Sequence, residues 1–352
     1  MNTVQSFDSF PTPKKQKQVV DEVSGWLRVY DDGSVDRTWT GPPEVKFMAE
    51  PAPPHLNFVD GVATKDVTID ENSGRRVRIY LPEKDCAAAT VAAGDKLPII
   101  LHFHGGGFCI TQADWYMYYA GYTRLARVAN AIVVSCYLPL GPDNRLPAAT
   151  ETGYAAFLWL RALSRGEARE PWLSDRGNFD KVFLVGDSSG ANIVHHVAAR
   201  AGNDDLAPLR LAGAILIHPG FCRSSRSKSE LEQPETPFLT LFMLDKFLAF
   251  GLPEGSTKDH PITCPMGSGA PPISGLKLPP YLYCVAEYDL LKDTEMEFYE
   301  AMKEANKDIE LLVNSGVGHI FYLNKVAVDM DPVTGSETER LLSEIAKFVE
   351  KH

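Results

Sequence analysis

Short apolar runs of strand length alternate along the chain with longer stretches that have helical periodicity. The strand-like runs are 97–103, 131–136, 181–185, 209–217, 281–286 and 309–313, and the helix-like stretches are 115–128, 150–163, 191–200, 294–305 and 336–349. The run at 97–103 is almost entirely apolar, as is typical of a central strand covered on both faces. Ser336 and Glu339 are expected to form a capping box for the last helix. This alternation predicts an α/β fold with a mostly parallel central sheet and helices on both faces.

The N-terminal part of the chain predicts a different local structure. Residues 19–23 suit a short helical turn, and residues 26–39 predict a β-hairpin with Asp-Asp-Gly-Ser at its turn. Residues 41–56 are proline-rich, so we expect an extended segment that lies over the body of the protein. Two further strands are expected at 62–69 and 75–81. Polar and apolar residues alternate in the second of these, which predicts that one of its faces is exposed to solvent.

One region breaks the alternation of strands and helices. Residues 221–280 contain no strand-like run, but a charge-rich stretch, a helical run at 239–250 and a coil rich in glycine and proline. We interpret this region as a lid inserted between two strands, over the edge of the sheet where open α/β proteins bind ligands. We therefore predict a single domain over 1–352, with a lid built from the N-terminal segment 1–56 and the insertion 221–280.

Composition and charge narrow the possible partners and the compartment. Of the 352 residues, 44% are hydrophobic and 23% are charged, and the net charge is −11. The largest basic cluster is the short one at 14–17, which argues against nucleic acids and anionic membranes as partners. The sequence has no secretory signal and no apolar run long enough to span a membrane, so we expect a cytoplasmic protein. Its six cysteines are scattered, which favours free thiols, and none has the spacing of a metal site.

A glycine-flanked serine stands between a strand-like run and a helix-like run. Lys181–Asn192 reads K-V-F-L-V-G-D-S-S-G-A-N, so Gly186 and Gly190 flank Ser188 at two residues on either side. The G-x-S-x-G pattern is weak by itself, but between a strand and a helix it predicts a nucleophile elbow. In such an elbow a very tight turn exposes the serine hydroxyl. Glycine is tolerated at such a turn because it has no Cβ to clash. The pattern predicts Ser188 as a nucleophile.

A run of three glycines follows the predicted central strand. The sequence His104–Phe108 is H-G-G-G-F, which lets backbone N–H groups turn outward at the end of the strand. Such a loop is the expected partner of a nucleophile elbow, because it supplies two hydrogen-bond donors to a developing oxyanion. The N–H of Ser189 is expected to supply a third donor, and His104 to hold the shape of the loop.

Among the nine histidines, His319 is the best candidate for the general base. It follows the last strand-like run and a glycine-bearing loop at 314–318, which completes the chain order serine, acid, histidine. His218 is the only rival, because it also ends a strand-like run. The other histidines lie in coil, in the elbow helix or inside strands.

Three carboxylates compete for the role of the orienting acid after the strand at 281–286. Glu287 is still on the strand. Asp293 lies beside the expected start of the next helix, where a structural role is favoured. Asp289 lies on the loop, where it can hold the tautomer of an imidazole and stabilise its cation. We therefore favour Asp289.

Together the H-G-G-G-F and G-D-S-S-G motifs, the loop of Asp289 and the Gly318-His319 pair resemble the hormone-sensitive-lipase-like branch of the α/β-hydrolases. Within that branch the chain looks most like the plant carboxylesterases, over residues 20–350. The resemblance implies the α/β-hydrolase fold and serine chemistry on carboxylic esters of small to medium molecules. In that chemistry Ser188 is the nucleophile, Asp289 the acid and His319 the base.

The resemblance also implies the remaining parts of the site. The oxyanion donors would be the N–H groups of Gly106, Gly107 and Ser189, and no metal or cofactor is needed. We expect a monomer or homodimer that binds a small-molecule ester or a specialised plant metabolite. Aromatic residues near the glycine loop and in the predicted lid are candidates to line the pocket: Phe108, Trp115, Tyr116, Tyr118, Tyr119, Phe238, Phe242 and Phe247.

Two alternative functions are compatible with the same motifs. Some members of this family catalyse eliminations, deacetylations or cyclisations, and departures from the usual family pattern at Pro139 and Ala191 are the sequence hint in that direction. The gibberellin receptors look like this family but have lost the catalytic histidine. Because His319 is present, we favour an enzyme over a receptor.

Overall fold

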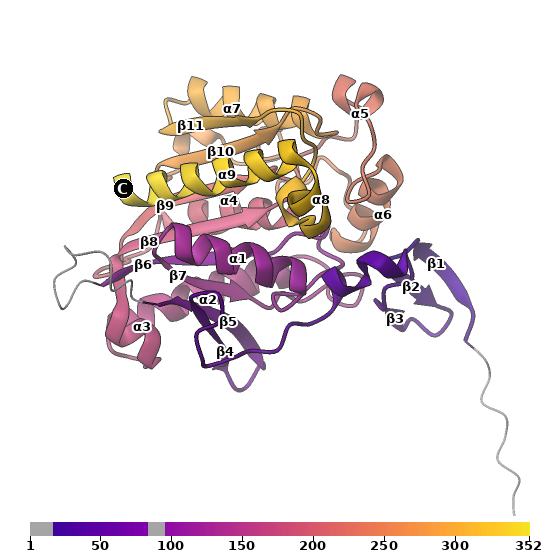
Figure 1. The fold of residues 1–352 in the computed structure, drawn as a ribbon. Helices are drawn as coiled ribbons and strands as arrows, with labels where there is room; N and C mark the ends of the chain where they lie inside the picture. The colour runs from indigo at the N-terminus through magenta and orange to yellow at the C-terminus, as the bar shows by residue number, and fades with distance from the viewer. Residues whose placement is uncertain (1–16, 84–95) are drawn as a thin grey trace, which may run out of the picture.

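Eight strands form one large sheet in the computed structural model, which describes residues 17–83 and 96–352 (Figure 1). Across the sheet their order is β11-β10-β9-β8-β6-β7-β5-β4. Their bounds are β4 Val62–Asp70, β5 Arg75–Pro82, β6 Leu97–Phe103, β7 Ile132–Cys136, β8 Gly177–Asp187, β9 Leu211–Ile217, β10 Tyr281–Ala286 and β11 Ile309–Asn314. The two pairs that β5 forms, with β4 and with β7, are antiparallel, and the other pairs are parallel. The mostly parallel sheet predicted from the sequence is therefore confirmed.

Helices cover both faces of this sheet (Figure 1). Helices α1 and α9 pack on one face, against side chains such as Ile100 and Phe183, and α2, α4 and α7 pack on the other, against side chains such as Leu101 and Leu184. The two core layers arise because successive residues of β6 and β8 point to opposite faces. The bounds of these helices are α1 Tyr116–Val128, α2 Ala148–Ser164, α4 Ser189–Ala201, α7 Lys292–Glu304 and α9 Pro332–Lys351.

The N-terminal residues form a separate small sheet beside the main body (Figure 1). Its antiparallel strands are β1 Val19–Val23, β2 Leu27–Tyr30 and β3 Val35–Asp36. The helical turn expected at 19–23 is wrong, because this segment pairs with β2 and places Val23 opposite Leu27. The proline-rich segment 41–56 is irregular except for the 3₁₀ helix η1, Pro43–Ala49, in which a proline occupies the first position.

Two polar contacts fasten this N-terminal segment to the body. Lys246, on α6 (Leu241–Gly251), pairs with Asp21 of β1 at 2.6 Å between Nζ and Oδ1. The guanidinium of Arg37 donates to the carbonyl oxygen of Cys109 at 2.7 Å. The segment is thereby held between α6 and the loop that follows β6.

The remaining helices are short, and several lie between β9 and β10. They are α3 Pro171–Arg176, α5 Lys228–Glu232, α8 Lys325–Met330, η2 Ile273–Gly275 and η3 Phe321–Leu323. The region 221–280 contains α5, α6 and η2 and contributes no strand to either sheet. It runs along the carboxyl ends of β8, β9 and β10, and α6 reaches the N-terminal sheet (Figure 1).

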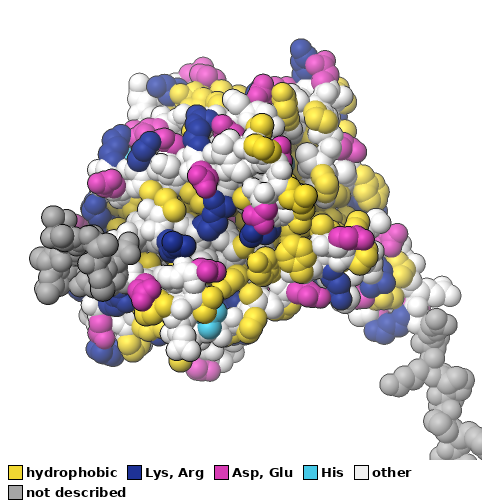
Figure 2. All heavy atoms as spheres, viewed as in Figure 1, with side chains coloured by type: hydrophobic (Ala, Val, Ile, Leu, Met, Phe, Trp, Pro, Cys, Tyr) yellow, Lys and Arg dark blue, Asp and Glu magenta, His cyan; other side chains and the backbone are white. Residues whose placement is uncertain are grey.

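The surface carries charges of both signs. On the face shown in Figure 2, acidic and basic side chains are intermixed, and hydrophobic side chains gather where the N-terminal sheet joins the body. Such mixing produces no broad basic field on this face that would attract the phosphates of a nucleic acid. In the described part of the chain, no helix combines the length and the apolar character needed to cross a bilayer.

Candidate active site

A sharp turn between β8 and α4 carries Ser188. β8 ends at Asp187 and α4 begins at Ser189, so a single residue connects them. Ser188 has φ 50° and ψ −126°, a strained conformation that costs about 1–3 kcal/mol for a residue with a side chain. A Cβ at Gly190 would lie 2.0 Å from the carbonyl oxygen of Phe103, so only glycine lets α4 pack this closely against the end of β6.

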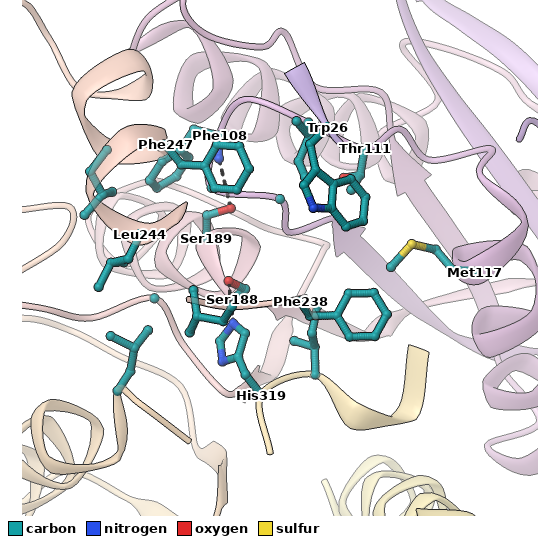
Figure 3. Close-up of a pocket in the computed structure, with 18 of the residues that line it drawn as sticks. Trp26, Phe108, Thr111, Met117, Ser188, Ser189, Phe238, Leu244, Phe247 and His319 are labelled. Atoms are coloured by element: carbon teal, nitrogen blue, oxygen red, sulfur yellow. Dashed lines mark hydrogen bonds between the residues drawn. The ribbon is translucent and has the colours of Figure 1, made fainter. Parts of the chain in front are cut away.

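His319 and Asp289 continue a line of hydrogen bonds that starts at Ser188. Ser188 Oγ lies 2.9 Å from His319 Nε2 (Figure 3), and His319 Nδ1 lies 2.6 Å from Asp289 Oδ2. The N–H of Leu291 donates to Asp289 Oδ1 at 2.9 Å, so both carboxylate oxygens are held. The three side chains come from the loops after β8, β10 and β11, at the carboxyl edge of the sheet. The structure thus brings together the three residues that the sequence analysis favours.

Burial and charge act in opposite directions on Asp289. Its side chain is fully buried, and burial alone would raise the pKa of a carboxyl group. The positive charge that His319 can carry and its hydrogen bond outweigh burial, and they hold the pKa of Asp289 below its usual value. Asp289 is therefore ionised, and it is placed to stabilise a positive charge on His319.

The rival histidine has a different role. His218 Nδ1 accepts a hydrogen bond from the N–H of Ile320 at 2.9 Å, and burial lowers the pKa of His218 to about 4. Ile320 has φ 44°, in the left-handed region, directly after His319. The neutral His218 ring therefore helps to hold the loop that presents His319, whereas Ser188 Oγ is bonded to His319.

The two rival acids also have other partners. Glu287 accepts a hydrogen bond from the N–H of Gly316 at 2.8 Å, and Asp293 accepts one from the N–H of Ser229 at 2.7 Å. Asp293 lies inside the first turn of α7, which begins at Lys292, two residues earlier than expected. Both carboxylates fasten loops, and neither is hydrogen-bonded to a histidine among the described residues.

The glycine loop places backbone donors beside Ser188. Gly106 and Gly107 have φ 96° and φ 60°, and a Cβ at Gly107 would lie 2.5 Å from Cβ of Phe247. Within the described chain, the N–H groups of Gly106, Gly107 and Ser189 have no hydrogen-bond acceptor, and all three residues line the cavity next to Ser188. Free N–H groups that converge on such a cavity are suited to bind an oxyanion.

Buried polar side chains hold this loop in place. The His104 ring and the Thr111 hydroxyl both donate to the carbonyl oxygen of Gly105, at 3.0 and 2.9 Å. The Tyr118 hydroxyl accepts the N–H of Gly105 and donates to Asp187 Oδ2, both at 3.0 Å. Burial lowers the pKa of His104 to about 4, so its ring is neutral. The H-G-G-G-F motif predicts this role for His104, whereas no local motif signals the contact between Tyr118 and Asp187.

The cavity beside Ser188 is small and apolar, with a volume of about 50 Å³. Its walls come from the glycine loop, the N-terminus of α4, the N-terminal segment and α6 (Figure 3). Four of the aromatic residues predicted from the sequence line it, namely Phe108, Tyr118, Phe238 and Phe247. The other four predicted aromatics are not among its lining residues, namely Trp115, Tyr116, Tyr119 and Phe242. Trp26 and Met117 line it without having been predicted (Figure 3).

A second apolar cavity adjoins the first one. It has a volume of about 200 Å³. Trp26, Met117 and Phe238 line both cavities and form the partition between them. The rest of its wall comes largely from the proline-rich segment and η1, and consists of Trp39, Pro42, Val45, Met48, Ala49, Pro237 and Asn324. Among these, Asn324 is the one residue with a polar side chain apart from the indole of Trp39.

Comparisons with known proteins agree with this geometry. A family described as alpha/beta hydrolase fold matches residues 100–323. The chain is 34% identical to probable carboxylesterase 6 of Arabidopsis thaliana, over 94% of this chain and 91% of that protein. It is also 34% identical to the 2-hydroxyisoflavanone dehydratase of Glycyrrhiza echinata, over 87% of this chain and 91% of that protein. Among solved structures, a hyperthermophilic esterase of the archaeon Pyrobaculum calidifontis matches with a TM-score of 0.65 and 26% identity, over 82% of this chain and 85% of that one.

Proposed function

The chain belongs to the α/β-hydrolase family, in the branch of the plant carboxylesterases, and from that premise we propose how it hydrolyses carboxylic esters. In our proposal Ser188 is the nucleophile, His319 is the general base and Asp289 orients and stabilises the imidazole. The observation that carries the proposal is the continuous line of hydrogen bonds at 2.9 and 2.6 Å through these three side chains. This order of groups is the arrangement that activates a serine hydroxyl.

The proposed reaction proceeds through an acyl-enzyme. His319 Nε2 takes the proton of Ser188 while Oγ attacks the ester carbonyl carbon. The negative charge that develops on the carbonyl oxygen is stabilised by the N–H groups of Gly106, Gly107 and Ser189. His319 then gives its proton to the leaving alcohol oxygen, and the ester C–O bond breaks. A water molecule, deprotonated by His319, attacks the acyl-enzyme and releases the carboxylic acid and the free Ser188 hydroxyl.

A fluorophosphonate probe tests this assignment directly. We expect the probe to form a covalent bond to Ser188 Oγ, because only an activated serine attacks phosphorus at an appreciable rate. Peptide mapping by mass spectrometry identifies the labelled residue. A folded chain that hydrolyses aryl acetates but carries the label at another serine, or no label, contradicts the proposal.

The two cavities indicate the shape of the substrate. The first cavity, at about 50 Å³, leaves room beside Ser188 for a small group such as an acetyl, since a single water molecule needs about 10–15 Å³ by the same measure. The second, at about 200 Å³, is lined almost entirely by apolar side chains. We propose that it binds the larger apolar part of the ester, across the partition of Trp26, Met117 and Phe238. The N-terminal segment and α6 would then act together as the lid over the site.

Closing the second cavity changes the substrate preference. Ala49→Phe adds an aromatic ring to a wall that is remote from Ser188. We expect the ratio of kcat/KM for a bulky apolar ester to kcat/KM for a small aryl acetate to fall by about 10- to 100-fold, since a few misplaced methylene groups have this effect. Val45→Ala, which enlarges the same cavity, should raise this ratio. Glu44→Ala, an exposed change on the same 3₁₀ helix, is the control. An unchanged ratio in both cavity variants contradicts the substrate proposal.

A second candidate reaction is supported by one of the relatives. The chain has the same identity, 34%, to the 2-hydroxyisoflavanone dehydratase and to probable carboxylesterase 6, and a dehydratase eliminates water instead of cleaving an ester. In such a reaction His319 would act as the base that removes a proton from carbon. Labelling of Ser188 by the probe without turnover of any simple ester would favour this candidate over hydrolysis.

We propose the cytoplasm as the compartment, and a monomer or homodimer as the working form. The five described cysteines are buried free thiols, which suits a reducing environment; Cys86 lies outside the described residues. Burial raises the pKa of several of these thiols, as at Cys284, so they are poorly reactive. In fractionated tissue, the probe-labelled chain should be recovered with cytosolic proteins. Recovery with organelles would contradict this assignment.

A further inference from the structure

Glu295, in the first turn of α7, is buried behind the proposed triad. Its side chain is fully buried, and in the described part of the chain neither of its carboxyl oxygens has a hydrogen-bond partner. Ionising a buried carboxyl group that has no hydrogen-bond partner is strongly unfavourable, because nothing replaces the water that would solvate its charge. Burial and then the negative charge of Asp289 raise the pKa of Glu295 well above its usual value. Glu295 is therefore a neutral acid in the folded chain.

The carboxyl group of Glu295 faces both Asp289 and His319. One oxygen of Asp289, one oxygen of Glu295 and one ring nitrogen of His319 all lie within 4.8 Å of one another. Both ring nitrogens of His319 already take part in hydrogen bonds, to Ser188 and to Asp289. We therefore interpret the cluster as two carboxyl groups that face one imidazole, and not as a metal site.

The other titratable groups described around this cluster are neutral or positively charged. The negative charge of the cluster therefore comes from Asp289 and Glu295. Lys292 lies at the start of α7, where its ammonium group donates to the carbonyl oxygen of Glu287 at 3.3 Å. Tyr283 donates its hydroxyl to the main-chain oxygen of Glu295 at 2.9 Å, and burial keeps this phenol protonated by raising its pKa. The neutral ring of His218 lies beside His319 on the other side, with 6.1 Å between ring centroids, and Cys284 is a buried thiol.

We infer that Glu295 is a reserve acid, a positioning residue that can supply the carboxylate for His319 when Asp289 is lost. The inference rests on the proposed function. Two buried carboxyl groups so close together share a single negative charge, because ionising both is strongly unfavourable. Asp289 holds that charge because it receives hydrogen bonds from His319 and from the N–H of Leu291. When Asp289 is removed, the repulsion that keeps Glu295 neutral disappears. Glu295 then releases its proton to solvent and pairs with the His319 cation.

A double-mutant cycle tests the inference. We compare kcat and KM for an aryl acetate in the native chain, Glu295→Gln, Asp289→Ala and the double variant. Asp289→Ala leaves room for Glu295 to reach His319, so we expect kcat to fall by only about 100-fold. The double variant should lose about 10⁴-fold, as is typical when a triad has no acid, with little change in KM. Glu297→Gln, an exposed change on the same helix, is the control and should not slow Asp289→Ala further.

A pH profile separates this role from a structural one. In both variants kcat should rise with pH as the general base becomes neutral, but in Asp289→Ala the profile should contain a second step, as Glu295 loses its proton, that the double variant lacks. Equal kcat values in Asp289→Ala and the double variant, with the same pH profile, overturn the inference. The proposed function is judged separately: if Ser188→Ala keeps the esterase activity, the function itself is wrong.

Stability against pH provides an independent check that does not require activity. The unfolded chain releases the proton of Glu295 near its usual pKa of about 4.3, whereas the folded chain retains it to a higher pH. The native chain therefore loses stability relative to Glu295→Gln as pH rises above that value, until Glu295 ionises in the folded state. The Tm of Glu295→Gln relative to that of the native chain should increase as the pH rises from about 4 towards the pH at which Glu295 ionises in the folded chain. A difference in Tm that stays constant over this range overturns the neutral state of Glu295 and the inference with it.

Discussion

Replacing Ser188 with alanine is expected to lower kcat for aryl esters by about 10⁴- to 10⁶-fold. The substitution removes the only oxygen that is hydrogen-bonded to His319 Nε2 in the described structure, so no acyl-enzyme can form. The oxyanion donors remain, and they leave a residual acceleration of about 10³–10⁴ over the uncatalysed reaction. Initial rates with p-nitrophenyl acetate at saturating concentration measure the effect. Circular dichroism and Tm establish that the variant is folded.

The matched control for this substitution is Ser336→Ala, an exposed serine on α9 that does not line the cavity beside Ser188. It should keep the native kcat and KM. A Ser188→Ala variant that retains more than about one-hundredth of the native kcat contradicts the nucleophile assignment. A loss of less than about 100-fold is the size expected for a residue that only assists proton transfer, and removing the nucleophile should cost more.

Gly190→Ala should be the most destabilising small substitution in the elbow. The added Cβ would lie 2.0 Å from the carbonyl oxygen of Phe103 and 2.8 Å from that of His104, and both are backbone atoms that cannot move without displacing β6. We expect a loss of about 4 kcal/mol or more in the free energy of unfolding, which puts this change among the exceptional ones. Denaturant unfolding followed by fluorescence measures it. Any folded fraction should also have little activity, because α4 carries Ser189 and positions Ser188.

Gly275→Ala is the control for this second prediction. A Cβ at Gly275 meets no atom within 4 Å, so the change should alter the free energy of unfolding by less than about 1 kcal/mol. If Gly190→Ala unfolds at the same denaturant concentration as Gly275→Ala, the close approach of α4 to β6 is not the constraint that we describe.

The main sheet and the proposed triad could be predicted because their signals are local. Each central strand is a short apolar run, and each neighbouring helix has its own periodicity, so element type follows from a window of about ten residues. Ser188 is marked by the glycines around it. His319 and Asp289 were chosen because they follow strands whose carboxyl ends meet at one edge of a parallel sheet. The arrangement of strands therefore brings together residues that are far apart in sequence.

Features that depend on contacts across the fold were predicted less well. The strand 75–81 was expected to have a solvent-exposed face, but Arg78 is only 1% exposed, because its guanidinium donates to both carboxylate oxygens of Asp66 at 2.8 and 2.9 Å. A charged residue in an alternating pattern looks exposed unless its partner is known. That partner lies on β4, and nothing in the sequence of β5 reveals it.

Helix ends were a second source of error. The capping box expected at Ser336 is wrong, because α9 begins at Pro332 and Asp331 caps it by accepting a hydrogen bond from the N–H of Thr334 at 2.8 Å. A proline at the first helical position and an aspartate before it are also a valid start signal. Two possible start signals for α9 lie close together in the sequence. The helix begins at the earlier one, which adds a further turn in which Thr334 is buried.

The partition of Trp26, Met117 and Phe238 has a consequence for how this kind of enzyme can diversify. In our proposal, the groups that break the ester bond lie on loops of the main sheet, whereas most of the surface that would select the substrate comes from segments near residues 26–49 and 237–247. Mutations can remodel the second set without disturbing the first. A few substitutions in the N-terminal fifth of the chain can thus change which substrates bind, while the catalytic residues stay the same.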